Sequence, residues 1–134
     1  MTRKAVFDAS VIVRATVDHA VDAEQWLTRL HSGQIDVFVP DLFYAEVASA
    51  YLRQVRQRRM QRDDAVESVA TVVGFPLETT SSRQLCAMTL AIAIGSRVTA
   101  YDAHYLALAE AEDAVLVTAD RALAAEAPRS VLLE

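Results

Sequence analysis

The chain has 134 residues, the usual size of one domain. Hydrophobic residues make up 53% and charged residues 23%, a composition typical of a globular protein with a buried core rather than of a disordered chain. The 18 acidic and 13 basic side chains give a formal net charge of −5, which argues against a protein that coats nucleic acid with a basic surface. It does not exclude a protein that meets nucleic acid through bound metal ions.

Three features narrow the class further. A single cysteine, Cys86, cannot form an internal disulfide, excludes a cysteine-rich zinc site and fits a reducing cytoplasm. In the C-terminal half, the longest uncharged run is the 13 residues between Arg83 and Arg97, too short to span a bilayer, so no membrane partner is expected. Three glycines cannot supply a glycine-rich phosphate loop. We therefore expect a cytoplasmic protein formed by one domain, residues 1–134.

Strand-like and helix-like patterns alternate along the chain. In chain order, we expect a strand at 4–7, helices at 10–16 and 22–32, a strand at 36–39, helices at 41–58 and 62–73, a short strand at 75–78, a helix at 81–94, a helix at 102–112, a strand at 114–117, a helix at 120–126 and a strand at 131–133. Gly33, Gly74 and Gly95 each follow a helical run, where a left-handed residue is expected. This alternation predicts an α/β domain whose mostly parallel sheet has helices on both faces.

Two aspartates follow predicted strands. Asp8 comes directly after the strand at 4–7, and Asp120 comes shortly after the strand at 114–117. In parallel sheets the carboxyl ends of the strands meet at one edge, where ligands bind, so both side chains are expected to point toward the same edge. Taken singly, each aspartate is explained equally well as the cap of the following helix. Two of them in one small domain shift the balance toward a shared site.

Two further carboxylates lie in predicted helices. The neighbours of Glu46 at three and four positions are Leu42, Phe43, Ser49 and Ala50. A carboxylate on a mostly apolar helix face is costly unless it is paired, binds metal or reaches water at the edge of that face, and we favour a functional role. Asp102 begins a helical face that continues at Leu106, and the alternative explanation is an aspartate that caps the helix or lies in its first turn.

Together, Asp8, Glu46, Asp102 and Asp120 could converge on one acidic pocket. Four adjacent carboxylates repel one another and would largely take up protons unless cations were present. Oxygen ligands of this kind select Mg²⁺ or Mn²⁺ rather than zinc. Such ions lower the pKa of a bound water and stabilise displacement at phosphorus. The residue chemistry therefore predicts a metal-dependent phosphodiesterase.

Four segments carry a family resemblance. They are Val6–Ser10 (VFDAS), the segment around Glu46, Tyr101–Ala109 (YDAHYLALA) and Leu116–Arg121 (LVTADR). This ordered set resembles the four acidic motifs of PIN-domain ribonucleases. Its order, spacing and chain length are similar to those of the small bacterial members, the VapC-type toxins of type II toxin–antitoxin pairs. The resemblance covers essentially the whole chain.

The resemblance implies a three-layer α/β/α PIN-like domain that binds Mg²⁺ or Mn²⁺ and cleaves RNA internally. It implies that the metal ligands and catalytic acids are Asp8, Glu46, Asp102 and Asp120. Thr118 matches a hydroxyl that precedes the last aspartate by two positions and holds a ligand or water; Ser10 could do the same, or simply cap a helix. The resemblance also implies a homodimer and a small VapB-like antitoxin whose C-terminal segment approaches the acidic groove.

Other polar and aromatic residues keep alternatives open. A dense basic run comprises Arg53, Arg56, Arg58, Arg59 and Arg62. This run could bind RNA phosphates away from the metal pocket, bind an acidic antitoxin surface, or be no more than a solvated helix end. His104 could line the groove but is more often a surface residue, and Tyr105 is interpreted as a core or dimer contact.

Two competing functions remain open from the residues alone. A non-catalytic PIN-like binding module would act through its partner, although the intact acids argue against it. A metal-dependent DNA nuclease would use similar site chemistry, because discrimination of the 2′-hydroxyl depends on details of the groove. Aspartyl-phosphate phosphatases and receiver domains fit worse, because Asp8 is followed by Ala9 and Ser10 rather than a second nearby acid and the only lysine is Lys4.

Overall fold

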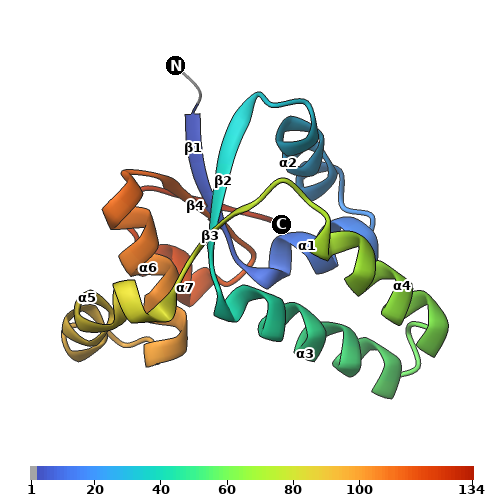
Figure 1. Cartoon of the computed structure of the whole chain (residues 1–134). Coiled ribbons are helices and arrows are strands. Elements are labelled where there is room, and N and C mark those ends of the chain that lie inside the picture. Colours follow the sequence, from blue (N-terminus) through green and yellow to red (C-terminus); the bar gives the residue numbers. More distant parts are fainter. Residues whose placement is uncertain (1–2) are drawn as a thin grey trace.

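The computed structural model describes residues 3–134 and contains twelve elements in this part of the chain (Figure 1). The strands are β1 (Arg3–Phe7), β2 (Ile35–Pro40), β3 (Glu78–Thr80), β4 (Val115–Thr118) and β5 (Ser130–Leu132). The helices are α1 (Ala9–Thr16), α2 (Val21–His31), α3 (Leu42–Arg56), α4 (Arg62–Val73), α5 (Ser82–Ile94), α6 (Ala100–Glu112) and α7 (Arg121–Glu126).

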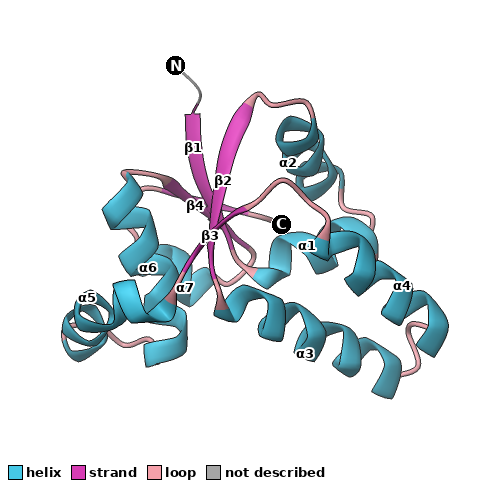
Figure 2. Ribbon diagram, viewed as in Figure 1, coloured by secondary structure: helices cyan, strands magenta, loops and turns pink. Residues whose placement is uncertain are grey.

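The strands form one parallel sheet in the order β3-β2-β1-β4-β5. Figure 2 shows α5, α6 and α7 on one side of the sheet and α1, α2 and α4 on the other, with α3 running along the edge where the strands end. The predicted three-layer α/β/α arrangement is confirmed. β1 lies at the centre of the sheet, between β2 and β4. The segments that follow β1 and β4 therefore begin side by side.

The central strands are apolar because both of their faces are covered. Ala5, Val6 and Phe7 of β1 are almost fully buried, and so are Leu116 and Val117 of β4. Burial on both faces explains why these strands are continuous apolar runs rather than alternating patterns. This packing fixes the positions at which the two strands end.

Within residues 3–134, no helix is both long and apolar enough to cross a membrane.

One predicted strand is displaced along the chain. The strand expected at 75–78 is found at Glu78–Thr80, where it pairs with the end of β2. Pro76 has no N–H to donate to a sheet, and the Leu77 N–H bonds the carbonyl of Phe75 at 2.8 Å in a tight turn before the strand. The other strands and helices begin and end within about two residues of the predicted limits.

The expectation of left-handed glycines is confirmed at one position and wrong at two. Gly33 has a φ of 77°, whereas Gly74 and Gly95 have φ of −85° and −89°. Helices α4 and α5 end in tight right-handed turns, in which these glycine N–H groups bond carbonyls three residues back. The left-handed residue that ends α6 is Asp113, with a φ of 51°.

Candidate active site

Four carboxylates line a single cavity of about 440 Å³: Asp8, Glu46, Asp102 and Asp120. Asp8 directly follows β1 and Asp120 follows β4, and these strands are parallel neighbours. Glu46 lies near the start of α3, which follows β2, and Asp102 lies in the first turn of α6. The topology thus brings residues up to 112 positions apart to one edge of the sheet, at its carboxyl end.

Two hydroxyl groups hold Asp8 in place. Its Oδ1 accepts hydrogen bonds from the hydroxyl and the N–H of Ser10, the latter at 3.0 Å, and its Oδ2 accepts one from the buried Thr118 hydroxyl at 2.5 Å. The same two hydroxyls also accept hydrogen bonds from backbone N–H groups just after β4. Ser10 Oγ accepts from the N–H of Ala119 at 2.8 Å, and Thr118 Oγ1 accepts from the N–H of Asp120 at 2.9 Å. Ser10 and Thr118 therefore join the ends of β1 and β4 into one rigid network.

Glu46 is positioned by a residue that the sequence analysis assigned to the core or to a dimer contact. The hydroxyl of Tyr105 donates a hydrogen bond of 2.9 Å to Glu46 Oε2. Tyr105 is fully buried, whereas Glu46 is only half-buried and reaches the cavity. The spacing of Tyr105 three positions after Asp102 was the available signal, since residues i and i+3 share a helix face.

Capping explains part of the pattern but not all of it. Asp120 Oδ1 accepts from the N–H of Leu123 at 3.1 Å and so caps α7, and Asp8 caps α1. Asp102 is not a cap, because Thr99 occupies that position and accepts from the Asp102 N–H at 3.1 Å. Both strand-end aspartates are thus caps, whereas Asp102 is a first-turn acid of α6, the other conventional role expected for it.

The cavity disfavours negative charge on three of its acids. Burial raises the pKa of Asp8, and the charge of Asp120 adds to this, while the bonds from Ser10 and Thr118 partly oppose it. Burial raises the pKa of Glu46, partly offset by its hydrogen bond from Tyr105. The pKa of Asp102 is raised by burial and by the charge of Asp120. A cation in the cavity would stabilise the charged form of these carboxylates.

The donor set fits a divalent cation in its chemistry. Its ligands are carboxylate oxygens, which Mg²⁺ and Mn²⁺ prefer. Among residues 3–134, no basic side chain forms an ion pair with any of the four acids, so their charge is not neutralised by the chain. In the described part of the molecule, no three acidic, histidine or cysteine side chains already converge tightly enough to enclose an ion.

Arg53 and Gln54 of α3 also line this cavity. Arg53 lies on the same helix face as Glu46, about two turns farther along, and Gln54 is buried beside it. The sequence analysis placed Arg53 in the basic run and did not single out Gln54. The spacing of seven positions between Glu46 and Arg53 could have indicated a shared helix face. His104 does not line the cavity, since its Nδ1 lies 2.7 Å from the carbonyl oxygen of Ala100 in its own helix.

Comparison with known proteins defines the class. The family model for the PIN domain matches residues 5–127, and the chain belongs to this family. The residues matched include all four acids of the cavity. Within the family, the chain is similar to Ribonuclease VapC3 from Pyrobaculum aerophilum, with 31% identity over 130 residues that cover 96% of this chain and 98% of the relative.

Solved structures share the fold. A crystal structure of PAE2754 from Pyrobaculum aerophilum matches with a TM-score of 0.76 and 24% identity, over 98% of this chain and 91% of that one. VapBC2 from Rickettsia felis, solved bound to a DNA fragment from its promoter, matches with a TM-score of 0.71 and 14% identity, over 98% and 99% of the two chains. A toxin–antitoxin complex from Klebsiella pneumoniae matches with a TM-score of 0.61 and 19% identity, over 95% of each chain.

Proposed function

We propose that residues 1–134 act as a single PIN-like domain, a cytoplasmic endoribonuclease that depends on Mg²⁺ or Mn²⁺ and is the toxin of a toxin–antitoxin pair. The observation that carries this proposal is that Asp8, Glu46, Asp102 and Asp120 line one cavity at the carboxyl edge of the sheet. A relative named as a ribonuclease and neighbours solved as toxin–antitoxin complexes support it.

In this proposal, the four acids hold the metal and the surrounding groups hold the acids. When bound, the ion lowers the pKa of a water and stabilises charge on the scissile phosphate. The hydroxyls of Ser10 and Thr118 donate hydrogen bonds to the two carboxylate oxygens of Asp8. Thr118 Oγ1 also accepts a hydrogen bond from the N–H of Asp120. Tyr105 keeps Glu46 aimed at the cavity. These contacts preorganise the carboxylates. Preorganised ligands increase the affinity of a site for a metal ion and define its coordination geometry.

Cleavage of RNA tests the activity. Purified protein is incubated with end-labelled single-stranded RNA and Mn²⁺, then with EDTA, and then as the Asp8→Asn variant. Asparagine also caps helices well, so this variant retains the cap of α1. We expect cleavage that disappears in both controls. Cleavage that survives both would refute the metal mechanism, and a matched DNA strand separates RNA from DNA cleavage.

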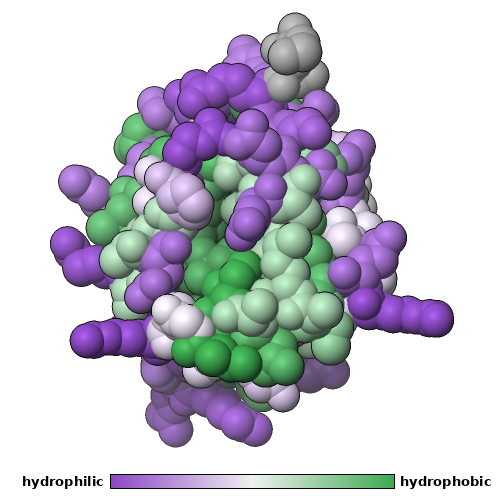
Figure 3. Space-filling model, turned by 90° about the vertical axis from the view of Figure 1, so that its left-hand side faces the viewer, coloured by the Kyte–Doolittle hydropathy of each residue, from purple (hydrophilic) through white to green (hydrophobic). Residues whose placement is uncertain are grey.

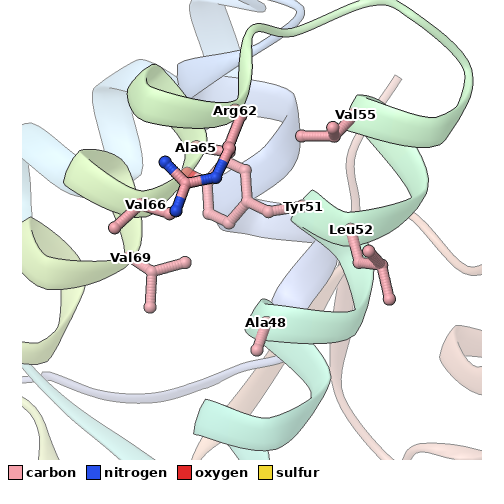
Figure 4. A pocket seen from close by; sticks show the side chains of 8 residues that line it. All are labelled: Ala48, Tyr51, Leu52, Val55, Arg62, Ala65, Val66 and Val69. Atoms are coloured by element: carbon pink, nitrogen blue, oxygen red, sulfur yellow. The ribbon is translucent and has the colours of Figure 1, made fainter.

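An apolar groove between α3 and α4 is the surface that we assign to the antitoxin. It has a volume of about 350 Å³ and is lined by Ala48, Tyr51, Leu52, Val55, Arg62, Ala65, Val66 and Val69 (Figure 4). Leu52 and Val66 remain 47% and 59% exposed, although both are apolar. An amphipathic segment of a partner laid into the groove would cover them. Arg62 at its rim could meet an acidic residue of that segment.

The outer face of α5 is the surface that we assign to the second copy of a homodimer. Leu90 and Ile94 are 59% and 77% exposed, and Met88 lies on the same helix at 39%. Figure 3 views the molecule from the side of α5 and α6 and shows apolar residues gathered there. A contiguous apolar surface is typical of an interface.

Two charge substitutions separate the antitoxin surface from the dimer surface. Leu52→Glu is expected to weaken binding of the protein encoded beside this gene while leaving the oligomeric state unchanged. Leu90→Glu is expected to convert a dimer to a monomer while leaving partner binding intact. Light scattering and co-purification measure the two properties. Metal-independent partner binding without any RNA cleavage would instead favour the non-catalytic binding module.

A further inference from the structure

The cavity that holds the four acids continues along α3 to a basic end. Its lining includes Glu46, Ser49, Ala50 and Arg53, which follow one another at three, four and seven positions from Glu46 and so share one helix face. Seven residues of helix rise about 10 Å. One cavity therefore has carboxylates at the edge of the sheet and a guanidinium roughly two turns farther along the helix.

Arg53 is exposed and stands apart from the acids whose cavity it shares. Within residues 3–134 it forms no ion pair, whereas Arg129 pairs with Asp113 at 2.9 Å and Arg62 with Asp63 at 2.6 Å. An arginine that lines an acidic cavity without neutralising it remains available to an anion from outside. Its planar guanidinium binds phosphate through two parallel hydrogen bonds.

The residue next to Arg53 adds a polar side chain to this end of the cavity. Gln54 is only 8% exposed, and it lines the same cavity. Its Oε1 is buried with no hydrogen-bond partner in the described part of the chain. A carbonyl oxygen only accepts hydrogen bonds, and a phosphodiester has no proton to donate, so the phosphate contact is assigned to Arg53 alone.

We propose that Arg53 binds a phosphate of the RNA strand beside the scissile one and positions that strand over the carboxylates, with Gln54 as its polar neighbour. The inference rests on the proposed RNA cleavage. The reason for this assignment is electrostatic. A polyanion that enters a cavity with four carboxylates is repelled by them, and a cationic side chain beside the acids offsets this repulsion. Arg53 is a positioning residue here, distant from the reacting atoms.

The first test separates this contact from general charge. Steady-state cleavage of a short single-stranded RNA in Mn²⁺ is measured over several salt concentrations for the wild type, Arg53→Gln, Arg53→Lys and Arg3→Gln. Arg3 begins β1 at the opposite end of the sheet and makes a charge-matched control. We expect Arg53→Gln to raise KM about tenfold with kcat nearly unchanged. The slope of log(1/KM) against log[salt] should fall in magnitude by about 0.7, the value for one phosphate on a single strand.

The controls fix the interpretation. Arg53→Lys should restore most of the salt slope because it restores the charge, and Arg3→Gln should match the wild type. Equal thermal stability of the Arg53 variants shows that they fold. A wild-type KM and salt slope in Arg53→Gln would overturn the inference and leave the nuclease function standing.

A second test locates the phosphate. One uncharged methylphosphonate linkage is moved along the RNA, and the same strands are also measured for binding by fluorescence anisotropy. One position should weaken binding to the wild type and have no further effect in Arg53→Gln. If the wild type binds in this manner but does not cleave, the phosphate contact stands and the proposed function falls. If the wild type neither cleaves nor binds RNA, both are refuted.

Discussion

The hydroxyl of buried Tyr105 donates a hydrogen bond of 2.9 Å to Oε2 of Glu46, which lines the acidic cavity, and so joins α6 to α3. The two residues are 59 positions apart, and they meet because both helices pack at the carboxyl edge of the sheet. Burial raises the pKa of Tyr105, and the negative charge of Glu46 raises it further, so the hydroxyl keeps the proton that it donates. Tyr105 therefore orients a carboxylate that would otherwise rotate freely in the cavity.

Tyr105→Phe removes this hydrogen bond and retains the aromatic packing. We expect the kcat of RNA cleavage to fall about tenfold, because Glu46 loses its fixed orientation. The free energy of unfolding should fall by about 1.5–3 kcal/mol, the usual contribution of a hydrogen bond to a charged group. Steady-state kinetics and urea unfolding measure the two effects. Wild-type kcat in a well-folded variant would remove Tyr105 from the site.

The acids predict an unusual pH dependence of stability in the metal-free protein. The pKa values of Asp8, Glu46 and Asp102 are raised in the folded state, mainly by burial. The folded state then binds more protons than the unfolded state near these pKa values, so the free energy of unfolding rises as the pH falls. Asp41 has a lowered pKa and acts in the opposite direction only at lower pH.

Chemical unfolding in EDTA over a pH series from 7.5 downward measures this effect. We expect the wild type to gain stability as the pH falls and Asp8→Asn to gain less, since that variant has lost one of the titrating groups. Saturating Mn²⁺ should flatten the wild-type profile, because the bound cation favours the charged carboxylates. Identical pH profiles for the wild type and Asp8→Asn would show that Asp8 carries no raised pKa.

Gln54 carries a buried oxygen whose removal is expected to raise stability. Replacing the residue with methionine removes an unpaired buried carbonyl oxygen and keeps a similar volume. We expect the free energy of unfolding to rise by about 1–3 kcal/mol, the usual cost of such an unpaired group. Urea unfolding of the wild type and the variant measures the difference. A variant that is destabilised would show that Gln54 has a structural role.

The fold was largely predictable because its signals are local. Apolar runs such as Val6–Phe7 and Leu116–Val117, each followed by a helical pattern, are what a parallel sheet covered on both faces requires. The error at 75–78 arose where apolar Phe75 and Leu77 pack from a turn rather than from a strand. Edge strands of three residues carry too little pattern to be placed precisely.

The site was predictable only in part, for a different reason. The strand-end positions of Asp8 and Asp120 follow from topology, and Glu46 and Asp102 were candidates because of their neighbours in the predicted helices. The family resemblance then implied that all four acids belong to one metal site. The groups that position them depend on contacts between distant helices, as with Tyr105 and Glu46, and no local pattern reports such a contact. The part played by Gln54 is visible only once its oxygen is seen to be buried and unpaired.

The central claim is that the four carboxylates act together as one divalent-metal site, and calorimetric titration with Mn²⁺ tests it most directly. The comparison uses the wild type, Asp102→Asn and Asp36→Asn. Asp102 lines the cavity but does not cap its helix, so its substitution leaves the fold intact, and Asp36 is an exposed acid of β2 outside the cavity. The account predicts that the wild type and Asp36→Asn bind Mn²⁺ with equal affinity. It predicts that Asp102→Asn binds Mn²⁺ at least tenfold more weakly. Equal affinity in all three proteins, or no binding by the wild type, would contradict it.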